Sequence, residues 1–292
     1  MFGLRARACY ALAKRRIRPP ESSTESAEAY VDWRSEVMAQ SWANFDDRLI
    51  QDKDVLDFGS GKGNLVFFLA PRGPKSVTGV ELHAPSVDES RARALTLDLP
   101  EHVPVRFEVG RTDRIPVPDN SADVLCAFDV VEHVMDPCQI IAEWARVLRP
   151  GGTVLLEWCP WRSPWGPHME SLVPLPWAHV IFGENAMFRT CEKIYDHPNY
   201  QHRTWDLNDD GSVAPNKWRN WNSFSQQGYI NQLNVGPFKT LAQAEGFEVS
   251  SFEHHTFQSL PAKDLIAPIL MQVPVLNEYL CSYVTGQLTL RS

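Results

Sequence analysis

The stretch that decides the fold is Asp54-Val55-Leu56-Asp57-Phe58-Gly59-Ser60-Gly61-Lys62-Gly63, which is followed by an apolar run over 64–70. Residues of strand type end in an acid, and glycine then occupies every second position. Glycine adopts positive φ angles readily and leaves no Cβ between the backbone and a ligand. The run after the loop predicts a helix whose N-terminal amides face that loop. The pattern therefore predicts either a cradle for a small molecule or an ordinary strand-loop-helix joint without a ligand.

Strand and helix patterns alternate outward from this stretch. We expect strands at 54–58, 77–82, 103–109, 122–128 and 153–158, and helices at 64–70, 85–97 and 138–148. A later helix at 238–245, a strand from 246 and an antiparallel strand at 284–291 complete the pattern. This order predicts an α/β fold with a doubly wound, seven-stranded, mostly parallel sheet. Ligands of such sheets bind beyond the carboxyl ends of the strands, where Asp57, Glu81, Asp113 and Asp129 are expected.

The composition limits the classes of protein that fit. The 292 residues are 43% hydrophobic and 22% charged, with a net charge of −8. No apolar run reaches the 18 residues that a membrane span needs, and the acidic balance argues against a general nucleic-acid-binding surface. Six scattered cysteines without zinc-like spacing predict reduced thiols in a cytoplasmic protein.

Residues 1–20 carry basic side chains and no acid. The cations are Arg5, Arg7, Lys14, Arg15, Arg16 and Arg18. The apolar residues among them are too interrupted for a secretory signal. Three interpretations stay open: a basic helix in peripheral contact with an anionic membrane, an arginine-rich organelle address, and a helix that is solvated or packed against the protein. A further helix is expected at 30–48.

Four segments of the chain resemble the class I S-adenosylmethionine-dependent methyltransferases. They are 55–63, 79–81, 115–125 and 146–152, and they follow one another in the order and spacing of that family over residues 50–158. The resemblance implies a Rossmann-like methyltransferase fold and an enzyme that uses S-adenosylmethionine and releases S-adenosylhomocysteine.

The resemblance also implies roles for individual residues. Gly59, Ser60 and Gly61 would pack against the methionine and sugar of the cofactor, Asp57 would help to hold its amino group, and Phe128 and Asp129 would flank its methionyl end. Leu82, Thr112 and Asp113 complete the expected cofactor-binding set. Glu81 is expected to hold the ribose hydroxyls, as a carboxylate at the tip of a second strand can; the alternative is an exposed loop glutamate. Arg111 departs from the family, which often has an acid at this position to bind the adenine amino group. Arginine cannot accept a hydrogen bond. Either Asp113 or a backbone carbonyl therefore binds the adenine, or Arg111 turns outward.

Two histidines are candidates for the general base. Methyl transfer depends mainly on alignment and on removal of the acceptor proton. His133, beside Glu132 after the fourth strand, suits this task because histidine exchanges a proton near neutral pH; the alternative is that the pair only braces the turn. Asp129-x-x-Glu132-His133 also resembles a metal cluster of some quinone and small-RNA methyltransferases. One short cluster is not a coordination sphere, so a divalent metal is not favoured and no metal ligand is assigned.

The residues after the fifth strand form a large aromatic insertion, 159–236, which contains six tryptophans. Loops of this length act as lids or binding elements. Their rings suit a ring-bearing or sugar-like acceptor; for most of them a core of the insertion itself is the better interpretation. Residues 160–168 resemble a stretch of some bacterial small-molecule methyltransferases and supply His168, a second candidate base or a loop brace. Two interpretations stay open for 172–182: an apolar lid helix and a contact for a lipid-linked acceptor.

These observations predict four segments. They are an N-terminal basic and helical segment (1–49), a cofactor-binding core (50–158), a substrate or lid insertion (159–236) and a C-terminal completion of the core with a helical insertion (237–292). The expected function is methyl transfer to a small-molecule or carbohydrate-like acceptor, most readily at oxygen. The alternatives are an RNA 2′-O-methyltransferase with a metal-assisted site and a catalytically silent cofactor-binding or scaffold protein. Nothing in the sequence specifies the oligomeric state.

Overall fold

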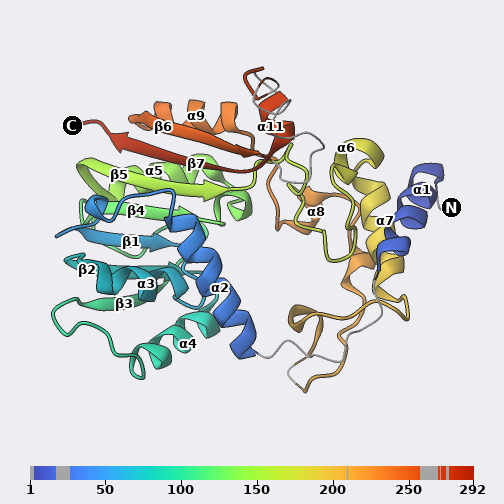
Figure 1. The fold of residues 1–292 in the computed structure, drawn as a ribbon, viewed down its shortest axis with the longest axis horizontal. Helices are drawn as coiled ribbons and strands as arrows, with labels where there is room; N and C mark the ends of the chain where they lie inside the picture. Colours follow the sequence, from blue (N-terminus) through green and yellow to red (C-terminus); the bar gives the residue numbers. More distant parts are fainter. Residues whose placement is uncertain (1–2, 18–26, 209, 257–268, 270, 274–275) are drawn as a thin grey trace. The chain divides into compact units, whose positions relative to one another are not determined.

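The computed structural model describes residues 3–17, 27–208, 210–256, 269, 271–273 and 276–292. The chain divides into two compact units. Unit 1 comprises Met1–Ser26, Cys159–Gln232 and Thr256–Ser282, and unit 2 comprises Ala27–Trp158, Leu233–His255 and Tyr283–Ser292. Figure 1 labels the helices and strands of both units.

Unit 2 is built on a sheet that has seven strands within the described residues, in the order β3-β2-β1-β4-β5-β7-β6 (Figure 1). The strands are β1 (Asp54–Phe58), β2 (Ser76–Glu81), β3 (Val105–Val109), β4 (Ala122–Phe128), β5 (Leu148–Trp158), β6 (Phe247–Thr256) and β7 (Cys281–Leu290). The pairs among β1 to β5 are parallel, whereas β7 runs antiparallel to β5. The predicted fold class, a doubly wound and mostly parallel sheet, is confirmed.

The strand order reverses at β1. This strand pairs with β2 on one side and with β4 on the other, so that Asp57 lies opposite both Gly79 and Cys126. The connections leave β1 and β4 in opposite directions, and their carboxyl ends therefore border a crevice where ligands of doubly wound folds bind. The glycine-rich loop begins at this point of the sheet.

Helices pack on both faces of this sheet. On one face, α2 (Ala27–Trp42), α3 (Asn64–Leu69) and α4 (Ala84–Ala94) contribute to one hydrophobic cluster with β1, β2 and β4. On the other face, Trp144 of α5 (Pro137–Val147) contacts Phe58, with ring centroids 5.8 Å apart, and Phe238 of α9 (Val235–Ala244). The period of two along β1 explains this division, because Val55 and Phe58 lie on opposite faces.

The two largest errors among the predicted boundaries of unit 2 are at the helix expected at 30–48 and at the fifth strand. The helix expected at 30–48 is α2, which ends at Trp42. A separate 3-10 turn, Asp47–Leu49, follows, and the side chain of its N-cap residue Asp46 accepts a hydrogen bond from the Arg48 backbone amide. The fifth strand begins at Leu148 rather than at 153. Gly151 has a φ of +78°, and the register with β4 shifts in this region, so the expected turn is an irregularity inside the strand.

Unit 1 is mainly helical. Its helices are α1 (Leu4–Ala13), α6 (Ala178–Phe182), α7 (Glu184–Tyr195), α8 (Phe224–Gln227) and α11 (Leu276–Leu280), with 3-10 turns at Lys14–Arg16, Thr204–Asp206 and Lys217–Asn220. Cys9 and Ala13 of α1 are buried in one cluster with Phe188 and Cys191 of α7. Of the three interpretations of the basic N-terminal segment, packing against the protein therefore holds for this buried side of α1.

Three of the six tryptophans of the insertion belong to the core of unit 1 or pack against it. Trp218 is 7% exposed and belongs to the cluster, while Trp161 and Trp221 pack against it. Trp177 donates a hydrogen bond from Nε1 to the Tyr279 carbonyl at 2.7 Å, whereas Trp205 is exposed. The prediction that most of these rings form the insertion's own core stays a prediction, since three of the six belong to this cluster or pack against it.

The lid helix, one of the two interpretations of 172–182, is shorter than that segment. Only α6, Ala178–Phe182, is helical, because Pro174 and Pro176 cannot donate the backbone hydrogen bonds that a helix needs. Much of the helical insertion expected within the segment 237–292 lies outside the described residues, and α11 is a helix in its described part at 276–280.

The cysteines do not form disulfides, and all six lie in described parts of the chain. Cys9, Cys126, Cys191 and Cys281 are buried. Burial raises the pKa of the Cys126 and Cys191 thiols well above the ordinary value, which keeps them protonated. None of the described helices is long and apolar enough to cross a membrane.

Candidate active site

Unit 2 has a pocket of about 200 Å³ at the carboxyl ends of β1 and β4. It is lined by Arg34, Met38, Asp57, Gly59, Ser60, Gly61, Lys62, Asn64, Leu65, Ser86 and Phe128. The predicted cofactor residues Asp57, Gly59, Ser60, Gly61 and Phe128 thus come together in one site. The pocket lies where the strand order reverses, as expected for this class of sheet.

The glycine loop crosses the pocket with two glycines that serve different purposes. Gly59 has a φ of +81°, and a Cβ there would lie 2.4 Å from Cγ2 of Val130. Gly61 has a φ of +51°, and a Cβ there would meet no protein atom within 4 Å. The first glycine is therefore required for packing, and the second leaves open backbone at the pocket wall.

Substitution of these two glycines separates packing from binding. Gly59→Ala is expected to destabilise the protein by about 3 kcal/mol, because the methyl group overlaps Val130 and the left-handed backbone is strained. Gly61→Ala is expected to cost only about 1 kcal/mol of stability and to weaken binding of S-adenosylhomocysteine, since its methyl group projects beside the pocket. Urea unfolding and calorimetry measure the two effects. Equal stability of the two variants would contradict the packing role of Gly59.

Asp57 is the buried acid of the pocket. Its side chain is 2% exposed, and its Oδ2 has no hydrogen-bond partner among the described residues. Burial, and then the negative charge of Glu81, raise the pKa of Asp57 to about 7, against the opposing effect of Arg34. A buried carboxylate oxygen without a partner is costly unless a ligand supplies a cation or a hydrogen-bond donor. The site is thus suited to a positively charged group.

Glu81 stands at the end of β2 and is held by the loop. Its Oε2 accepts a hydrogen bond from the Gly61 amide at 3.0 Å, and its Oε1 accepts one from the His83 amide at 2.9 Å. Each carboxylate oxygen retains capacity for a second donor. Neither Glu81 nor the next residue, Leu82, which is 54% exposed, is among the residues that line the pocket.

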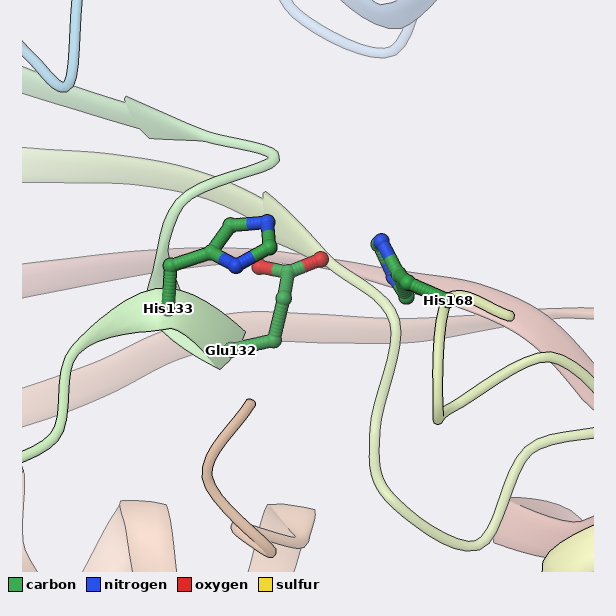
Figure 2. Close-up of side chains that lie close together, drawn as sticks. All are labelled: Glu132, His133 and His168. Atoms are coloured by element: carbon green, nitrogen blue, oxygen red, sulfur yellow. The ribbon is translucent and has the colours of Figure 1, made fainter. Parts of the chain in front are cut away.

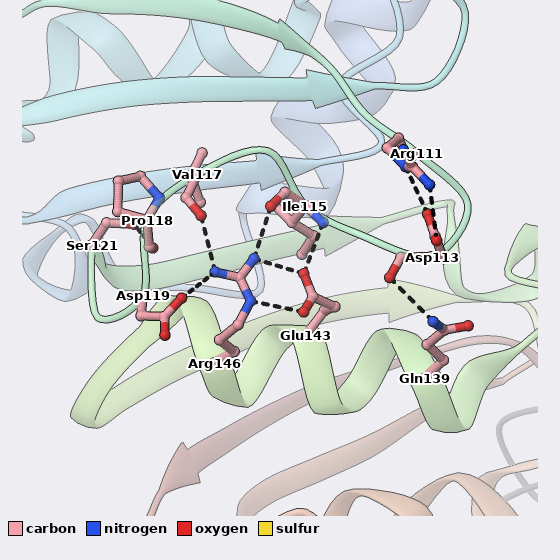
Figure 3. A network of polar contacts seen from close by, with 10 residues as sticks. All are labelled: Arg111, Asp113, Ile115, Val117, Pro118, Asp119, Ser121, Gln139, Glu143 and Arg146. Atoms are coloured by element: carbon pink, nitrogen blue, oxygen red, sulfur yellow. Dashed lines mark hydrogen bonds and ion pairs between the residues drawn. The ribbon is translucent and has the colours of Figure 1, made fainter.

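The residues expected after the third strand lie on the surface. Arg111 donates from Nε and Nη2 to the two carboxylate oxygens of Asp113, at 2.9 and 3.1 Å (Figure 3). This pairing lowers the pKa of Asp113 and satisfies the arginine that departs from the family pattern. Thr112 between them is exposed, and neither Thr112 nor Asp113 lines the pocket.

Arg34 of α2 is a site residue that the sequence analysis did not identify. It lines the pocket, and its Nη1 lies 2.8 Å from Oδ2 of Asp129, which has a φ of +54° at the end of β4. The ion pair joins residues 95 positions apart in the chain. No motif marks Arg34; the only signal in the sequence is a cation within a predicted helix before the first strand.

A half-buried acid, Glu157 of β5, was also missed. Ser41 donates a hydrogen bond from Oγ to Oε1 of Glu157 at 2.7 Å. Burial, with smaller contributions from Asp129 and Glu132, raises the pKa of Glu157 to about 7. Several acids and the cation of Arg34 thus influence one another at this end of the sheet.

The candidate bases lie on different segments, which Figure 2 labels. Glu132 and His133 belong to the 3-10 turn Val131–His133 after β4; Glu132 is 2% exposed, and His133 is half-buried. His168 belongs to unit 1, where its backbone has a φ of +52° and donates a hydrogen bond to the Trp165 carbonyl at 2.8 Å. Both histidines are therefore held by ordered local backbone.

The sequence of this chain is similar to those of known methyltransferases. A family model described as a methyltransferase domain matches residues 56–156. The chain is 34% identical over 102 residues to the 27-O-demethylrifamycin SV methyltransferase of Amycolatopsis mediterranei (strain S699), with 35% of this chain and 37% of that protein covered. It is 30% identical over 165 residues to an uncharacterized methyltransferase of Mycobacterium sp. (strain KMS), with 56% and 60% covered. The chain thus spans 37% to 60% of the length of these relatives.

One solved structure agrees in fold. The crystal structure of an S-adenosylmethionine-dependent methyltransferase from Mesorhizobium loti matches with a TM-score of 0.53 at 15% identity, over 89% of this chain and 99% of that chain. Similarity at this level of identity concerns the fold alone. It agrees with the seven-stranded, doubly wound sheet of unit 2.

Proposed function

Because this chain belongs to the class I S-adenosylmethionine-dependent methyltransferases through its residues 56–156, we propose that it transfers a methyl group to a small-molecule or carbohydrate-like acceptor, most readily at an oxygen atom. The observation that carries the proposal is the pocket at the carboxyl ends of β1 and β4. It joins the open glycine loop to the buried acid Asp57. The resemblance of the motifs and the matching relatives support the same chemistry.

The residues that line the pocket, together with Glu81 beside the glycine loop, fit the cofactor part by part. Asp57 would receive the ammonium group of the methionine tail, because its buried carboxylate oxygen has no protein partner among the described residues. Arg34 would receive the carboxylate of the same tail while it stays paired with Asp129. Glu81, fixed by the Gly61 amide, would accept hydrogen bonds from the two ribose hydroxyls.

The protein's own task in the reaction is alignment and removal of a proton. When bound, S-adenosylmethionine supplies an electrophilic methyl group on a sulfonium sulfur. The acceptor oxygen would form the new bond to the methyl carbon as the carbon–sulfur bond breaks, and the hydroxyl proton would pass to a histidine nitrogen. We propose His133, on the turn after β4, as this base, with His168 as the second candidate and Glu132 as the acid beside His133.

Alanine variants test the two bases separately. Loss of the true base is expected to lower kcat by about 100-fold or more without changing the affinity for S-adenosylhomocysteine. His133→Ala and His168→Ala are compared with His102→Ala, which removes an exposed histidine that does not line the pocket. Steady-state kinetics and calorimetry measure the two quantities. If both variants keep wild-type turnover, neither histidine is the base.

The acceptor would be recognised by unit 1, in agreement with the proposed role of residues 159–236. Unit 1 has an open pocket of about 580 Å³ whose lining includes Tyr195, Tyr200 and His202. Tyr200 donates a hydrogen bond to Oδ2 of the buried Asp206 at 3.0 Å, which fixes its ring. Ordered rings with polar groups suit a ring-bearing or sugar-like molecule. The name of the Amycolatopsis relative, an O-demethylrifamycin methyltransferase, supports oxygen as the acceptor atom.

Metal removal is expected to leave the activity unchanged. Asp129, the first acid of the Asp-x-x-Glu-His segment, is paired with Arg34 at 2.8 Å, and a cation at this position competes with a metal ion for the carboxylate. Turnover is therefore expected to be the same in an excess of chelator as in added Mg²⁺ or Mn²⁺. Restoration of a lost activity by either ion would contradict this arrangement.

The decisive experiment identifies the acceptor. The full chain is incubated with S-adenosylmethionine that carries a deuterated methyl group and with an extract of the source organism, and products are analysed by mass spectrometry. We expect the label to appear in a small molecule. This labelling requires the intact glycine loop and is expected to decrease with the Gly61→Ala variant, which serves as the control. Label confined to RNA would favour the nucleic-acid alternative. Binding of S-adenosylhomocysteine without any labelled product would favour a silent cofactor-binding protein.

A further inference from the structure

The helix α1 has one side buried in unit 1 and an opposite side that carries cations and apolar residues. Ala6, Cys9 and Ala13, at helical spacing, are 3%, 0% and 0% exposed. This buried side packs with α7 in the core of unit 1. Leu4 and Leu12, by contrast, are 84% and 43% exposed. The side chains of Leu4 and Leu12 are therefore not part of the core of unit 1.

Exposed cations surround these leucines. They are Arg5, Arg7, Lys14, Arg15 and Arg16, and residues 3–17 contain no acid. Arg16 donates to the Pro174 carbonyl at 2.8 Å, which joins the end of this segment to the rest of unit 1. The charge is local, because the whole chain has a net charge of −8. Such a positive surface on an acidic protein is complementary to an anionic partner.

The neighbouring helix α6 adds apolar surface. It packs against α1 within unit 1, and its Val180 and Ile181 are 52% and 58% exposed. Single exposed apolar residues are ordinary in proteins. Here four of them, Leu4, Leu12, Val180 and Ile181, belong to two packed helices, one of which is basic. Cations beside exposed apolar side chains offer an anionic bilayer both electrostatic and apolar contacts.

We propose that residues 4–16, with the exposed apolar side chains of α6, form a docking surface for an anionic lipid bilayer. The cations contact anionic headgroups, and each strengthens binding several-fold. The leucines, Val180 and Ile181 enter the boundary between headgroups and acyl chains. A nucleic acid would satisfy the cations but would offer no apolar phase to these side chains, so the bilayer is the better partner.

Vesicle binding tests this surface on the full chain. Co-sedimentation is measured with vesicles of phosphatidylcholine alone and with vesicles that contain 30% phosphatidylglycerol. We expect binding at least tenfold tighter to the anionic vesicles, and weaker binding as salt is raised. Arg5→Glu with Arg15→Glu is expected to lower the affinity about 30-fold or more, and Leu4→Asp with Leu12→Asp to lower it about tenfold.

The control carries the same change of charge elsewhere. Lys53→Glu with Arg106→Glu alters two exposed residues of unit 2 and is expected to leave vesicle binding nearly unchanged. Thermal unfolding verifies that every variant keeps the stability of the wild type. Three results would overturn the proposal: equal binding to neutral and anionic vesicles, equal losses in the control and α1 variants, and tighter binding of an RNA oligonucleotide than of anionic vesicles.

Discussion

The Asp57→Asn variant is expected to bind S-adenosylhomocysteine about 100-fold more weakly than the wild-type protein at pH 8. Asp57 is 2% exposed, and its Oδ2 has no partner among the described residues, so the ammonium group of the ligand would meet a desolvated charge. Asparagine preserves the shape of the side chain and removes that charge. Isothermal titration calorimetry at fixed salt measures the difference directly.

The expected ion pair between the Asp57 carboxylate and the ammonium group of the ligand also predicts how binding depends on pH. Since the pKa of Asp57 is raised to about 7, the carboxyl is mostly ionised at pH 8 and mostly protonated at pH 6. Binding to the wild type is therefore expected to weaken about tenfold between pH 8 and pH 6, and binding to the double variant Asp57→Asn with Glu157→Gln to stay constant. Glu157 also has a pKa of about 7, so Glu157→Gln is needed to separate the two titrations.

The stability of the ligand-free protein is expected to change in the opposite direction. A carboxyl whose pKa is higher in the folded state keeps its proton there after the unfolded chain has lost it. The stability of the wild type therefore falls as the pH rises from about 4 to about 7, and the full cost is present above pH 7. Asp57→Asn removes this cost and is expected to be more stable at pH 8 by about 4 kcal/mol, with no gain below pH 4.

A ligand without the amino-acid tail provides the matched control. 5′-Methylthioadenosine retains the adenine and ribose but lacks the ammonium and carboxylate groups. The Asp57→Asn and Arg34→Met variants are both expected to bind it as the wild type does, while both lose affinity for S-adenosylhomocysteine. If Asp57→Asn weakens binding of the two ligands equally, the acid maintains the shape of the pocket and does not receive the ammonium group.

The core of unit 2 could be predicted because its signals are local. Each strand from β1 to β4 shows a short run of apolar or β-branched residues, and each ends near a glycine or an acid. Alternation with helices then leaves few topologies, since parallel crossovers have one hand. Asp57, Gly59 and Phe128 could be assigned to one pocket for the same reason, because the ends of neighbouring parallel strands lie together.

The missed site residues depend on tertiary packing. Arg34 reaches Asp129 from a helix 95 positions earlier, and nothing near Arg34 in the sequence marks that contact. Glu157 reads as one polar residue in a strand, whereas its raised pKa arises from burial and from acids on other segments. The shortened lid helix is different, since Pro174 and Pro176 were visible in the sequence and should have ended the prediction there.

The second large effect is expected at Arg146 of α5, which holds the loop between β3 and β4. Its guanidinium donates to both carboxylate oxygens of Glu143, at 2.7 and 2.6 Å, and to the carbonyls of Ile115 and Val117 (Figure 3). It also contacts Asp119 at 2.6 Å, and the side chain is 19% exposed. Arg146→Met is expected to destabilise the protein by about 3 kcal/mol, because Glu143 and two carbonyls lose their donor together.

Arg111 provides a control within the same loop. It also makes two bonds to one carboxylate, that of Asp113, but the side chain is 71% exposed, and water replaces the lost contact. Arg111→Met is therefore expected to leave the free energy of unfolding, measured in urea, unchanged. Arg146→Lys is expected to recover little of the loss, since an ammonium group cannot reproduce the planar fork that serves Glu143 and the loop carbonyls together. Equal unfolding free energies for Arg146→Met and Arg111→Met would show that the loop is held by its apolar residues, with the buried Ile115 as the main anchor.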